Sequence, residues 1–262
     1  MKKHFFRLII GLIFLSIIFG FIIFLNQSYG FFILSKPYFN ETYVSLRFDD
    51  GLKSQEHAFE LLRKYNFTGS IYVITNKLSS EIDWEKSYYL GWEDINEISD
   101  FMEIGSHTMN HSDLTKDFDY GDEIKESKYA LTERGFQAKS FAYPGGIYNM
   151  RILRSVEQNY QCAITQDIGT NRVPLRTHLL KSFTIRGHTS MDTVKRVIKK
   201  GKWNILVFHD INQIDNEEMP RFLENIANFN SVDDGFFEEI LKYLKENNIK
   251  VITVAEGCEK WT

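Results

Sequence analysis

The sequence predicts an α/β fold, a barrel of alternating strands and helices, preceded by one N-terminal transmembrane helix. Three observations lead to this prediction. Short apolar runs typical of buried strands alternate with amphipathic helical patterns from Tyr43 onward. The alternating part, residues 41–262, has a length that fits one barrel-type domain rather than two. Residues 8–25 carry no charged side chain at all.

The uncharged run follows three basic residues, Lys2, Lys3 and Arg7. As a helix it would extend about 27 Å, close to the hydrocarbon thickness of a bilayer. The basic residues before it predict a cytoplasmic N-terminus and an extracellular location for everything that follows. A cleaved signal peptide is the alternative, but the run is long and only the weak site "SYG" at residues 28–30 follows it.

We therefore expect an uncleaved signal anchor in the cell membrane, with secretion as the outcome if the segment is cleaved. The predicted organisation is a cytoplasmic N-terminus at 1–7, a transmembrane anchor at 8–25, a juxtamembrane stalk at 26–40 and a catalytic domain at 41–262.

The predicted extracellular domain is acidic. The first 40 residues hold four Lys or Arg and no acid, so the net charge of −4 for the whole chain leaves −8 on residues 41–262. Binding to nucleic acid needs a basic face, and we expect no nucleic acid partner. Cys162 and Cys258 could pair in an oxidising compartment. Cys162 lies in a strand-like stretch, which favours a buried free thiol, and the sequence leaves the pairing open.

The elements are expected in alternating order. Apolar and β-branched runs predict strands at 43–48, 69–75, 102–106, 140–144, 161–165, 204–210 and 250–254. Amphipathic patterns predict helices at 54–67, 92–101, 123–134, 150–158, 192–200 and 236–248, the first with Ser54 as N-cap. The longest irregular stretch is 211–232, and a loop of that length in a compact domain is usually functional or mobile.

Polar residues that are unusual at the end of a buried strand follow four of the predicted strands. In parallel α/β folds the carboxyl ends of the strands share one mouth, so these side chains should converge there. They are Asp49 and Asp50, His107 and His111, the turn "YPGG" at 143–146, and His209 with Asp210.

Two of these histidines predict a metal site. His107 and His111 are four residues apart, and on a helical turn they would share a face. With Asp50 they complete a set of two imidazoles and one carboxylate, which suits zinc with open positions and also suits non-haem iron. Two exposed histidines at the start of a helix are the alternative, which the nearby carboxylate makes the weaker one.

The other polar residues suggest acid–base roles. A carboxylate beside a metal-bound water can take its proton, which gives Asp49 a task distinct from that of Asp50. The strand-end residue His209 could donate a proton to a leaving group. Asp210 is better explained as an orienting or capping residue.

Four motifs together match a known family. "RFDDG", "HTMNH", "AYPGG" and "ILVFHD", in this order and spacing, resemble the polysaccharide deacetylases with the NodB homology domain, carbohydrate esterase family 4. The resemblance covers residues 43 to about 256. It implies a distorted (β/α) barrel and a metal-dependent hydrolase that removes N-acetyl or O-acetyl groups from a polysaccharide.

The resemblance also implies a role for each matching residue. Asp49 corresponds to the general base and His209 to the general acid. Asp50, His107 and His111 correspond to the ligands of one divalent ion, expected to be Zn²⁺. The backbone N–H of Gly145 corresponds to a donor for the oxyanion, which is consistent with a fixed dipole aimed at developing charge.

The sequence departs from the family at two positions. Many members have an arginine two residues before the proline, which braces the base, and here that residue is Ala142. Many also carry an aspartate near a tryptophan that tunes the catalytic histidine, for which Asp167 and Arg186 are weak substitutes. Both departures leave the proposed ligands and acid–base residues in place.

We therefore expect a membrane-anchored extracellular enzyme that deacetylates a glycan. One alternative is a metal-dependent amidase that acts on a small non-sugar amide. A closed pocket would favour this alternative. The second is a non-catalytic glycan-binding protein on the same scaffold. Retention of Asp49, Asp50, His107, His111 and His209 together argues against the second alternative.

Overall fold

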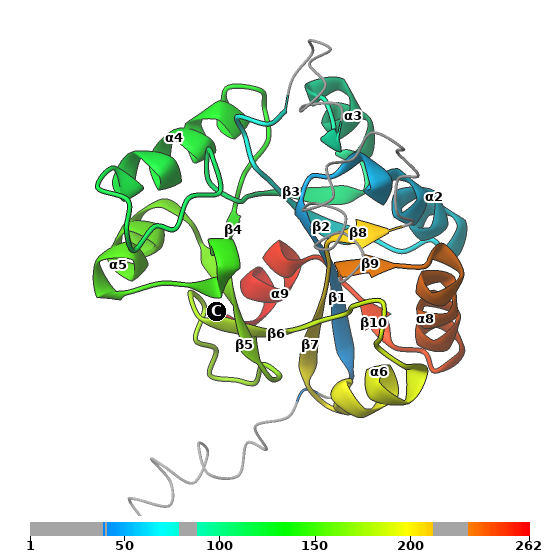
Figure 1. Ribbon diagram of the computed structural model, residues 1–262. Coiled ribbons are helices and arrows are strands. Elements are labelled where there is room, and N and C mark those ends of the chain that lie inside the picture. The colour runs from blue at the N-terminus through cyan, green and yellow to red at the C-terminus, as the bar shows by residue number, and fades with distance from the viewer. Residues whose placement is uncertain (1–38, 40, 79–87, 212–229) are drawn as a thin grey trace, which may run out of the picture. The chain divides into compact units, whose positions relative to one another are not determined.

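The computed structural model describes residues 39, 41–78, 88–211 and 230–262, and its centre is a closed barrel of parallel strands (Figure 1). The strands pair in chain order, and β7 returns to pair with β1. The α/β barrel expected from the sequence is thus confirmed. The strands are β1 (Tyr43–Asp50), β2 (Gly69–Val73), β3 (Met102–Ser106), β4 (Ser140–Ala142), β5 (Cys162–Ile168), β6 (Leu180–Thr184) and β7 (Trp203–Phe208).

Strand β1 is the most enclosed element. It pairs with β7 along one edge, and with β2 and the short β10 (Lys250–Val251) along the other. Its alternate side chains divide between two cores. Val44, Leu46 and Phe48 face the surrounding helices, while Tyr43 belongs to the core inside the barrel. The outward face of β1 is therefore apolar, while its inward face changes from Tyr43 to the buried polar residues Ser45, Arg47 and Asp49 toward the site.

Among the described residues, six helices surround the barrel: α2 (Glu56–Tyr65), α3 (Trp92–Ile98), α4 (Tyr120–Thr132), α5 (Met150–Asn159), α6 (Met191–Val197) and α8 (Asp234–Glu246). Helices α2 and α8 pack on β1 and β7 through aromatic rings. The ring of Phe48 lies 5.5 Å from that of Phe59 and 5.6 Å from that of Phe208, and Phe208 lies 5.0 Å from Phe237. This outer packing fixes the positions of β1 and β7, the two strands that end at the site.

A helix that the sequence interpretation missed, α9 (Val254–Trp261), closes the amino end of the barrel. The expected strand at 250–254 ends at Val251, and Thr253 begins the helix through a capping box with Glu256. The packing is close: a Cβ on Gly257 would come within 2.3 Å of the Trp203 ring, so only glycine fits there.

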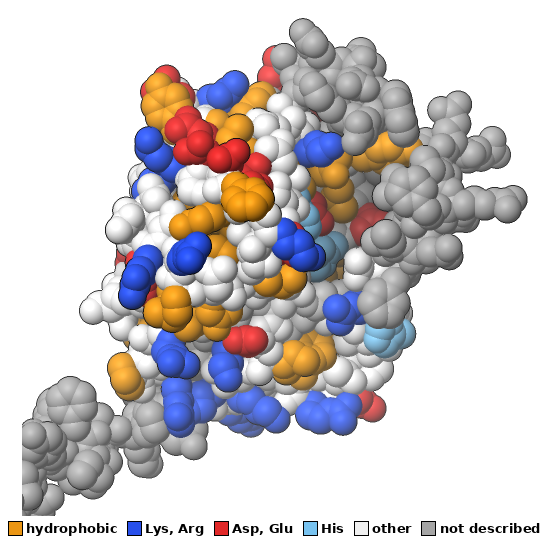
Figure 2. Space-filling model, turned by 60° about the vertical axis from the view of Figure 1, so that its left-hand side comes forward, with side chains coloured by type: hydrophobic (Ala, Val, Ile, Leu, Met, Phe, Trp, Pro, Cys, Tyr) orange, Lys and Arg blue, Asp and Glu red, His pale blue; other side chains and the backbone are white. Residues whose placement is uncertain are grey.

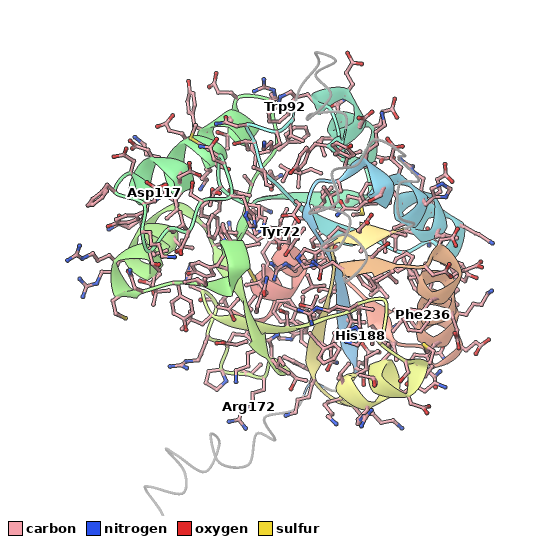
Figure 3. The ribbon with its side chains drawn as sticks, in the orientation of Figure 1. Tyr72, Trp92, Asp117, Arg172, His188 and Phe236 are labelled. Atoms are coloured by element: carbon pink, nitrogen blue, oxygen red, sulfur yellow. A yellow bond between two sulfur atoms is a disulfide. The ribbon has the colours of Figure 1, made fainter. Side chains whose placement is uncertain are left out.

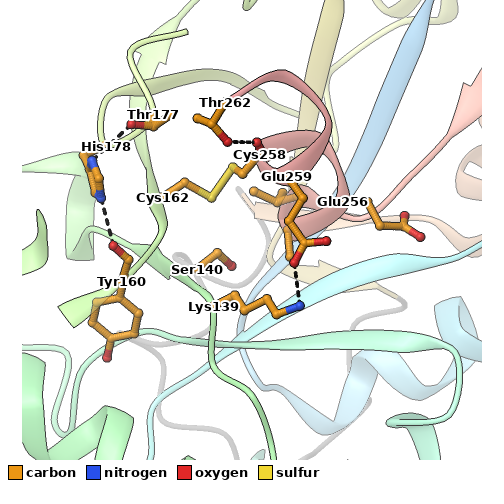
Figure 4. The surroundings of a disulfide bond; sticks show 12 residues. Lys139, Ser140, Tyr160, Cys162, Thr177, His178, Glu256, Cys258, Glu259 and Thr262 are labelled. Atoms are coloured by element: carbon orange, nitrogen blue, oxygen red, sulfur yellow. Dashed lines mark hydrogen bonds and ion pairs between the residues drawn. A yellow bond between two sulfur atoms is a disulfide. The ribbon is translucent and has the colours of Figure 1, made fainter.

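The two cysteines form a disulfide, which corrects the interpretation of Cys162 as a free thiol. Cys162 at the start of β5 is bonded to Cys258 of α9, with their Cα atoms 6.4 Å apart (Figure 4). An ion pair between Lys139 and Glu259, at 2.5 Å, lies beside it. The covalent bond attaches α9 to the barrel wall.

A buried polar network completes the amino end. The Glu103 carboxylate accepts hydrogen bonds from the hydroxyls of Ser70 and Ser140 and from the backbone N–H of Ala255 in α9. The Ser140 hydroxyl in turn lies 2.7 Å from that of Tyr72, near the middle of the barrel (Figure 3). Burial raises the pKa of Glu103. Its partners all lie within the barrel and its closing helix.

The structure corrects some smaller expectations. Strand β6 was not predicted, and the N-cap of α2 is Gln55, the last residue of the 3₁₀ turn η1 (Lys53–Gln55), rather than Ser54. The ends of the long irregular stretch pair as two short strands, β8 (Asp210–Ile211) and β9 (Ser231–Val232).

The predicted transmembrane helix at 8–25 lies outside the described residues, as does almost all of the predicted stalk. In the part of the chain that the structure describes, no helix has both the length and the apolar character needed to cross a membrane.

Candidate metal centre and active site

The first site residue, Asp49, is held by an arginine from its own strand. Residues two apart on a strand share a face, and the Arg47 side chain donates two parallel hydrogen bonds to the Asp49 carboxylate, both 2.6 Å long. Both side chains are fully buried. Arg47 also donates to the Thr165 carbonyl at 3.3 Å and lies 5.4 Å from the centre of the Tyr72 ring. Its guanidinium is therefore fixed from three sides.

This pair determines the charge of Asp49. Burial raises the pKa of the carboxyl, but the charges of Arg47, His107 and His209 outweigh burial, so the pKa lies below its ordinary value. Asp49 is therefore a carboxylate at neutral pH, with its two oxygens oriented by the arginine.

Asp50 points elsewhere because the strand ends in a left-handed residue. Asp50 has φ of 73° and Gly51 has φ of 75°, so the chain turns away from strand alternation at this point. The Asp50 oxygen Oδ1 lies 3.5 Å from Nε2 of His107 and 3.6 Å from Nε2 of His111. This oxygen is buried and makes no hydrogen bond to any described residue.

The two histidines reach Asp50 from an irregular loop after β3, which corrects the expectation of a helical turn. Thr108 and His111 both have positive φ, 68° and 61°. The Thr108 hydroxyl accepts from the N–H of His111 at 3.0 Å, and the Glu123 carboxylate of α4 accepts from the N–H groups of Met109 and Asn110. Strained backbone of this kind persists where surrounding contacts fix it.

The barrel fixes the proton position on His107. Its Nδ1 lies 2.8 Å from the Ala142 carbonyl on β4, and since a carbonyl only accepts, Nδ1 donates and Nε2 keeps its lone pair. Burial is the main cause that lowers the pKa of His107 to about 4, so its ring is neutral at neutral pH. The short distance to Asp50 is therefore not an ion pair, and it leaves two electron-pair donors facing each other.

These three residues fit a divalent ion. One donor atom from each of Asp50, His107 and His111 lies within 4.8 Å of the other two. Two imidazoles and a carboxylate are a ligand set suited to zinc and related ions. The orphaned Asp50 oxygen and the fixed lone pair of His107 are what such a set needs. The residues that the sequence predicted as ligands are thus brought together.

His209 follows β7 and lies on the other side of Asp49. Its Nε2 is 3.8 Å from Oδ2 of Asp49, and its side chain is 17% exposed. Its Nδ1 is buried and has no hydrogen-bond partner among the residues described. The aspartate that orients this histidine in many family members thus has no described counterpart here, and Asp167 is exposed on β5.

A residue that the sequence interpretation missed joins the two strand ends. The amide of Gln55 donates to the backbone carbonyl of Asp49 at 2.6 Å and to that of His209 at 2.5 Å. Gln55 is fully buried in the 3₁₀ turn that follows β1. Neighbouring Asp210 is hydrogen bonded to Ser54 and Ser231, and burial raises its pKa. Asp210 thus orients the chain, as expected.

The glycine turn lies at the end of β4, in the 3₁₀ turn η3 (Pro144–Gly146). Gly145 has φ of 59° and Gly146 has φ of 70°. A Cβ on Gly146 would lie 2.6 Å from the backbone nitrogen of Gln166, so the turn packs directly on β5. Gly145 itself is exposed, in the turn that follows the strand whose Ala142 carbonyl holds His107.

A family model matches the part of the chain that carries most of these motifs. Residues 36–163 match the family model "Polysaccharide deacetylase", a segment that includes Asp49, Asp50, His107, His111 and Gly145 and ends before His209. No curated protein sequence matches the chain significantly.

Solved structures of deacetylases are similar to the barrel. A polysaccharide deacetylase from Bacillus cereus has 26% identity and a TM-score of 0.54 over 59% of this chain and 51% of its own, so the match spans about half of that relative. The deacetylase PplD of Streptococcus pyogenes, in complex with acetate, has 25% identity and a TM-score of 0.53 over 59% of this chain and 70% of its own.

A mutant of the peptidoglycan deacetylase PdaC from Bacillus subtilis shares the fold over more of the chain. Its TM-score is 0.57 at 18% identity, and the match covers 86% of this chain and 94% of the PdaC chain. The family model, the related structures and the cluster of potential ligands agree. The part of the chain that matches the family model, residues 36–163, belongs to the polysaccharide deacetylase family.

Proposed function

We propose that this protein is a metal-dependent hydrolase that removes acetyl groups from a cell-surface or extracellular polysaccharide. The observation that carries the proposal is the joint placement of two sets of groups. Asp50, His107 and His111 converge within 4.8 Å, and the carboxylate of Asp49, braced by Arg47, lies beside them. An ion site next to an oriented base is the arrangement that metal-assisted hydrolysis requires.

The residues divide the chemistry as follows. Asp50, His107 and His111 hold the divalent ion, with zinc as the first choice for this ligand set. A bound ion would supply Lewis acidity and lower the pKa of water. Asp49 accepts the proton of the attacking water, because Arg47 keeps it ionised and fixes both oxygens. A separate base is needed since Asp50 faces the histidines.

His209 and Gly145 serve the other half of the reaction. The Nε2 of His209 passes a proton to the leaving nitrogen or oxygen of the sugar, and the leaving group then departs neutral. The backbone N–H of Gly145 donates to the oxyanion that forms when water adds to the acetyl carbonyl. The positive φ of Gly145 aims this N–H without the strain that a side chain would add.

A polymer substrate is favoured over a small amide by the exposure of the site. The His111 side chain is 42% exposed and that of Asp50 is 20% exposed. Apolar side chains also lie open after the strands that carry the site, with Ile147 following β4 and Ile168 at the end of β5. An open site suits a chain that extends past it, whereas a small amide would be bound in an enclosed pocket.

The location is proposed from two features. The basic residues before the uncharged run at 8–25 favour a single-pass topology with the catalytic domain outside the cell. The disulfide between Cys162 and Cys258 supports an oxidising environment for that domain.

Acetate release tests the proposed activity. Purified full-length protein is incubated with N-acetylated and O-acetylated glycans and with small N-acetyl amides, before and after treatment with a chelator. We expect release from at least one glycan, its loss with chelator and its return when zinc is added. Release of acetate from small amides alone would contradict the polysaccharide substrate and favour the metal-dependent amidase. Binding of glycan without any release would favour the non-catalytic alternative.

A further inference from the structure

Positive charge is concentrated in one segment of an otherwise acidic domain. Residues 171–204 contain nine Lys or Arg and one Asp, although residues 41–262 carry a net charge of −8. Five of these basic residues gather around the beginnings of β6 and β7, and we name them the basic rim: Arg172, Lys181, Lys199, Lys200 and Lys202.

Two asparagines bring the basic rim together. The Asn171 side chain donates to the Lys181 carbonyl and accepts from the Lys181 N–H, both at 2.9 Å, while its backbone N–H donates to the Trp203 carbonyl at 2.8 Å. Asn204 accepts from the Lys199 N–H at 2.9 Å and donates to the carbonyls of Lys199 and Lys202, both at 3.2 Å. Three separate segments are thus fixed side by side.

Four side chains of the basic rim face solvent. Arg172, Lys181, Lys199 and Lys200 are exposed, and none of them belongs to an ion pair with a described acid. Burial and the charge of Arg172 both lower the pKa of Lys202, as expected where like charges crowd. Some lysines elsewhere are paired with an acid, such as Lys64 with Glu238 and Lys139 with Glu259. A concentration of exposed basic side chains held on a fixed backbone favours an anionic partner.

The rim lies where the chain enters the domain. The N–H of Phe39 donates to the Gly201 carbonyl, and that of Tyr43 to the Lys202 carbonyl, both at 3.0 Å. In Figure 3, Arg172 lies at the bottom, the end where β1 starts, and Figure 2 shows Lys and Arg side chains in a row along the same lower edge. From there β1 rises roughly 23 Å to Asp50, at about 3.3 Å per residue.

We propose that the basic rim binds the anionic phospholipid head groups of a membrane and holds the metal centre away from the bilayer. The proposal rests on the proposed topology, in which the uncharged run at 8–25 is anchored in that membrane. Only 13 residues separate this run from Phe39, so the entry point of the chain stays within about 45 Å of the bilayer. This tether lets the rim reach the surface, and basic residues within about 10 Å of an anionic surface are attracted to it.

Lysine labelling in vesicles tests this surface. The full-length protein is reconstituted in vesicles of phosphatidylcholine alone or mixed with phosphatidylglycerol, and a water-soluble amine reagent is added at low and at high salt. Mass spectrometry gives the labelling rate of each lysine. We expect Lys181, Lys199 and Lys200 to be protected several-fold in the anionic vesicles at low salt. Lys116 and Lys125 should label equally in both vesicle types.

Two matched variants test whether the protection depends on the basic rim or on positive charge in general. In the variant Lys199→Gln with Lys200→Gln, the several-fold protection of Lys181 should be largely lost, since each basic side chain near an anionic surface contributes about fivefold to binding. In the variant Lys116→Gln with Lys125→Gln, which removes the same charge from other exposed positions, the protection should remain.

The outcomes distinguish this proposal from the proposed topology. Equal labelling in neutral and anionic vesicles overturns it, as does protection by a soluble anionic polymer but not by vesicles. If an alkaline wash strips the protein from both vesicle types, the anchor at 8–25 is wrong. The rim is then tested by flotation of the unanchored protein: salt-sensitive flotation with anionic vesicles supports the proposal, and no flotation overturns it.

Discussion

The two ends of the barrel treat buried polar groups in opposite ways. At the amino end the Glu103 carboxylate accepts three hydrogen bonds, and α9 with its disulfide covers the network. At the carboxyl end Oδ1 of Asp50 and Nδ1 of His209 are buried without a partner among the described residues. Unsatisfied buried atoms cost stability, and proteins retain them where function needs them. The contrast assigns stability to one end and chemistry to the other.

Removal of a ligand should have the largest effect. His107→Ala deletes one of three donors, and we expect bound metal to be lost and acetate release to fall by about 10⁴-fold or more, because Lewis acidity contributes several kcal/mol. Metal analysis and circular dichroism would show loss of the ion with retention of the fold. His57→Ala on the exposed face of α2 is the control. Near-normal activity in a metal-free variant would refute the ligand assignment.

The adjacent aspartates should differ in what they lose. Asp49→Asn keeps the size of the side chain but cannot act as a base, so it should retain metal and lose activity by about 10²–10⁴-fold. Asp50→Asn should weaken metal binding, and added metal should partly restore its rate.

Metal titration with parallel rate measurements would distinguish the two aspartate variants. Loss of metal in Asp49→Asn, or near-normal turnover, would contradict this division of roles. Reversed outcomes would preserve the hydrolase but exchange the two residues.

The arginine brace should have a smaller effect on rate. Arg47→Lys keeps the positive charge but loses the parallel pair of hydrogen bonds, so kcat should fall by about 10- to 100-fold while metal content is unchanged. Arg47→Ala leaves the Asp49 charge buried and unpaired, which should destabilise the fold by about 3–5 kcal/mol. Steady-state kinetics and denaturant unfolding measure the two effects.

Two further variants test the role of the arginine brace. Arg63→Lys, whose ion pair with Asp100 is exposed, should change neither quantity. Adding Ala142→Arg to the Arg47→Ala background places an arginine at the position used by many family members. Recovery of part of the lost rate would show that either strand can supply the brace.

The disulfide should affect stability and leave the rate unchanged. Replacing Cys162 and Cys258 together by Ser should lower the free energy of unfolding by about 2–4 kcal/mol, because the bond closes a long loop in the unfolded chain. Acetate release at room temperature should stay within about threefold, since the bond lies at the closed end. Unfolding of both proteins with and without reductant provides the measurement. A large loss of rate in the folded double variant would contradict the assignment of stability to the amino end and of chemistry to the carboxyl end.

The alternation of strands and helices was predictable because most strands are apolar on both faces and most helices are amphipathic. Two elements were missed for identifiable reasons. Strand β6 contains Lys181 and Ser182 and is short, so its pattern is weak. The β-branched residues before α9 read as a longer strand, although Thr253 and Glu256 form a capping box that marks a helix start.

The ligands were predictable from their residue types and their places after strands, while their local conformation was not. The spacing of His107 and His111 suggested a helix, but positive φ values at Thr108 and His111 bring them together in a loop. The brace was not predicted because the family resemblance points to position 142, where this sequence has alanine. A signal was present: Arg47 lies within an apolar strand, two residues before Asp49, and a buried charge there needs a counter-charge.

The double hydrogen bond of the Gln55 amide has a consequence for regulation. By holding the carbonyls of Asp49 and His209 at once, it makes the two proton-transfer residues one mechanical unit. A movement that separated base from acid would break both bonds and leave a buried amide unsatisfied. Parting the two backbone segments would therefore cost about 1–3 kcal/mol. Control of substrate entry or of the ion supply avoids this cost.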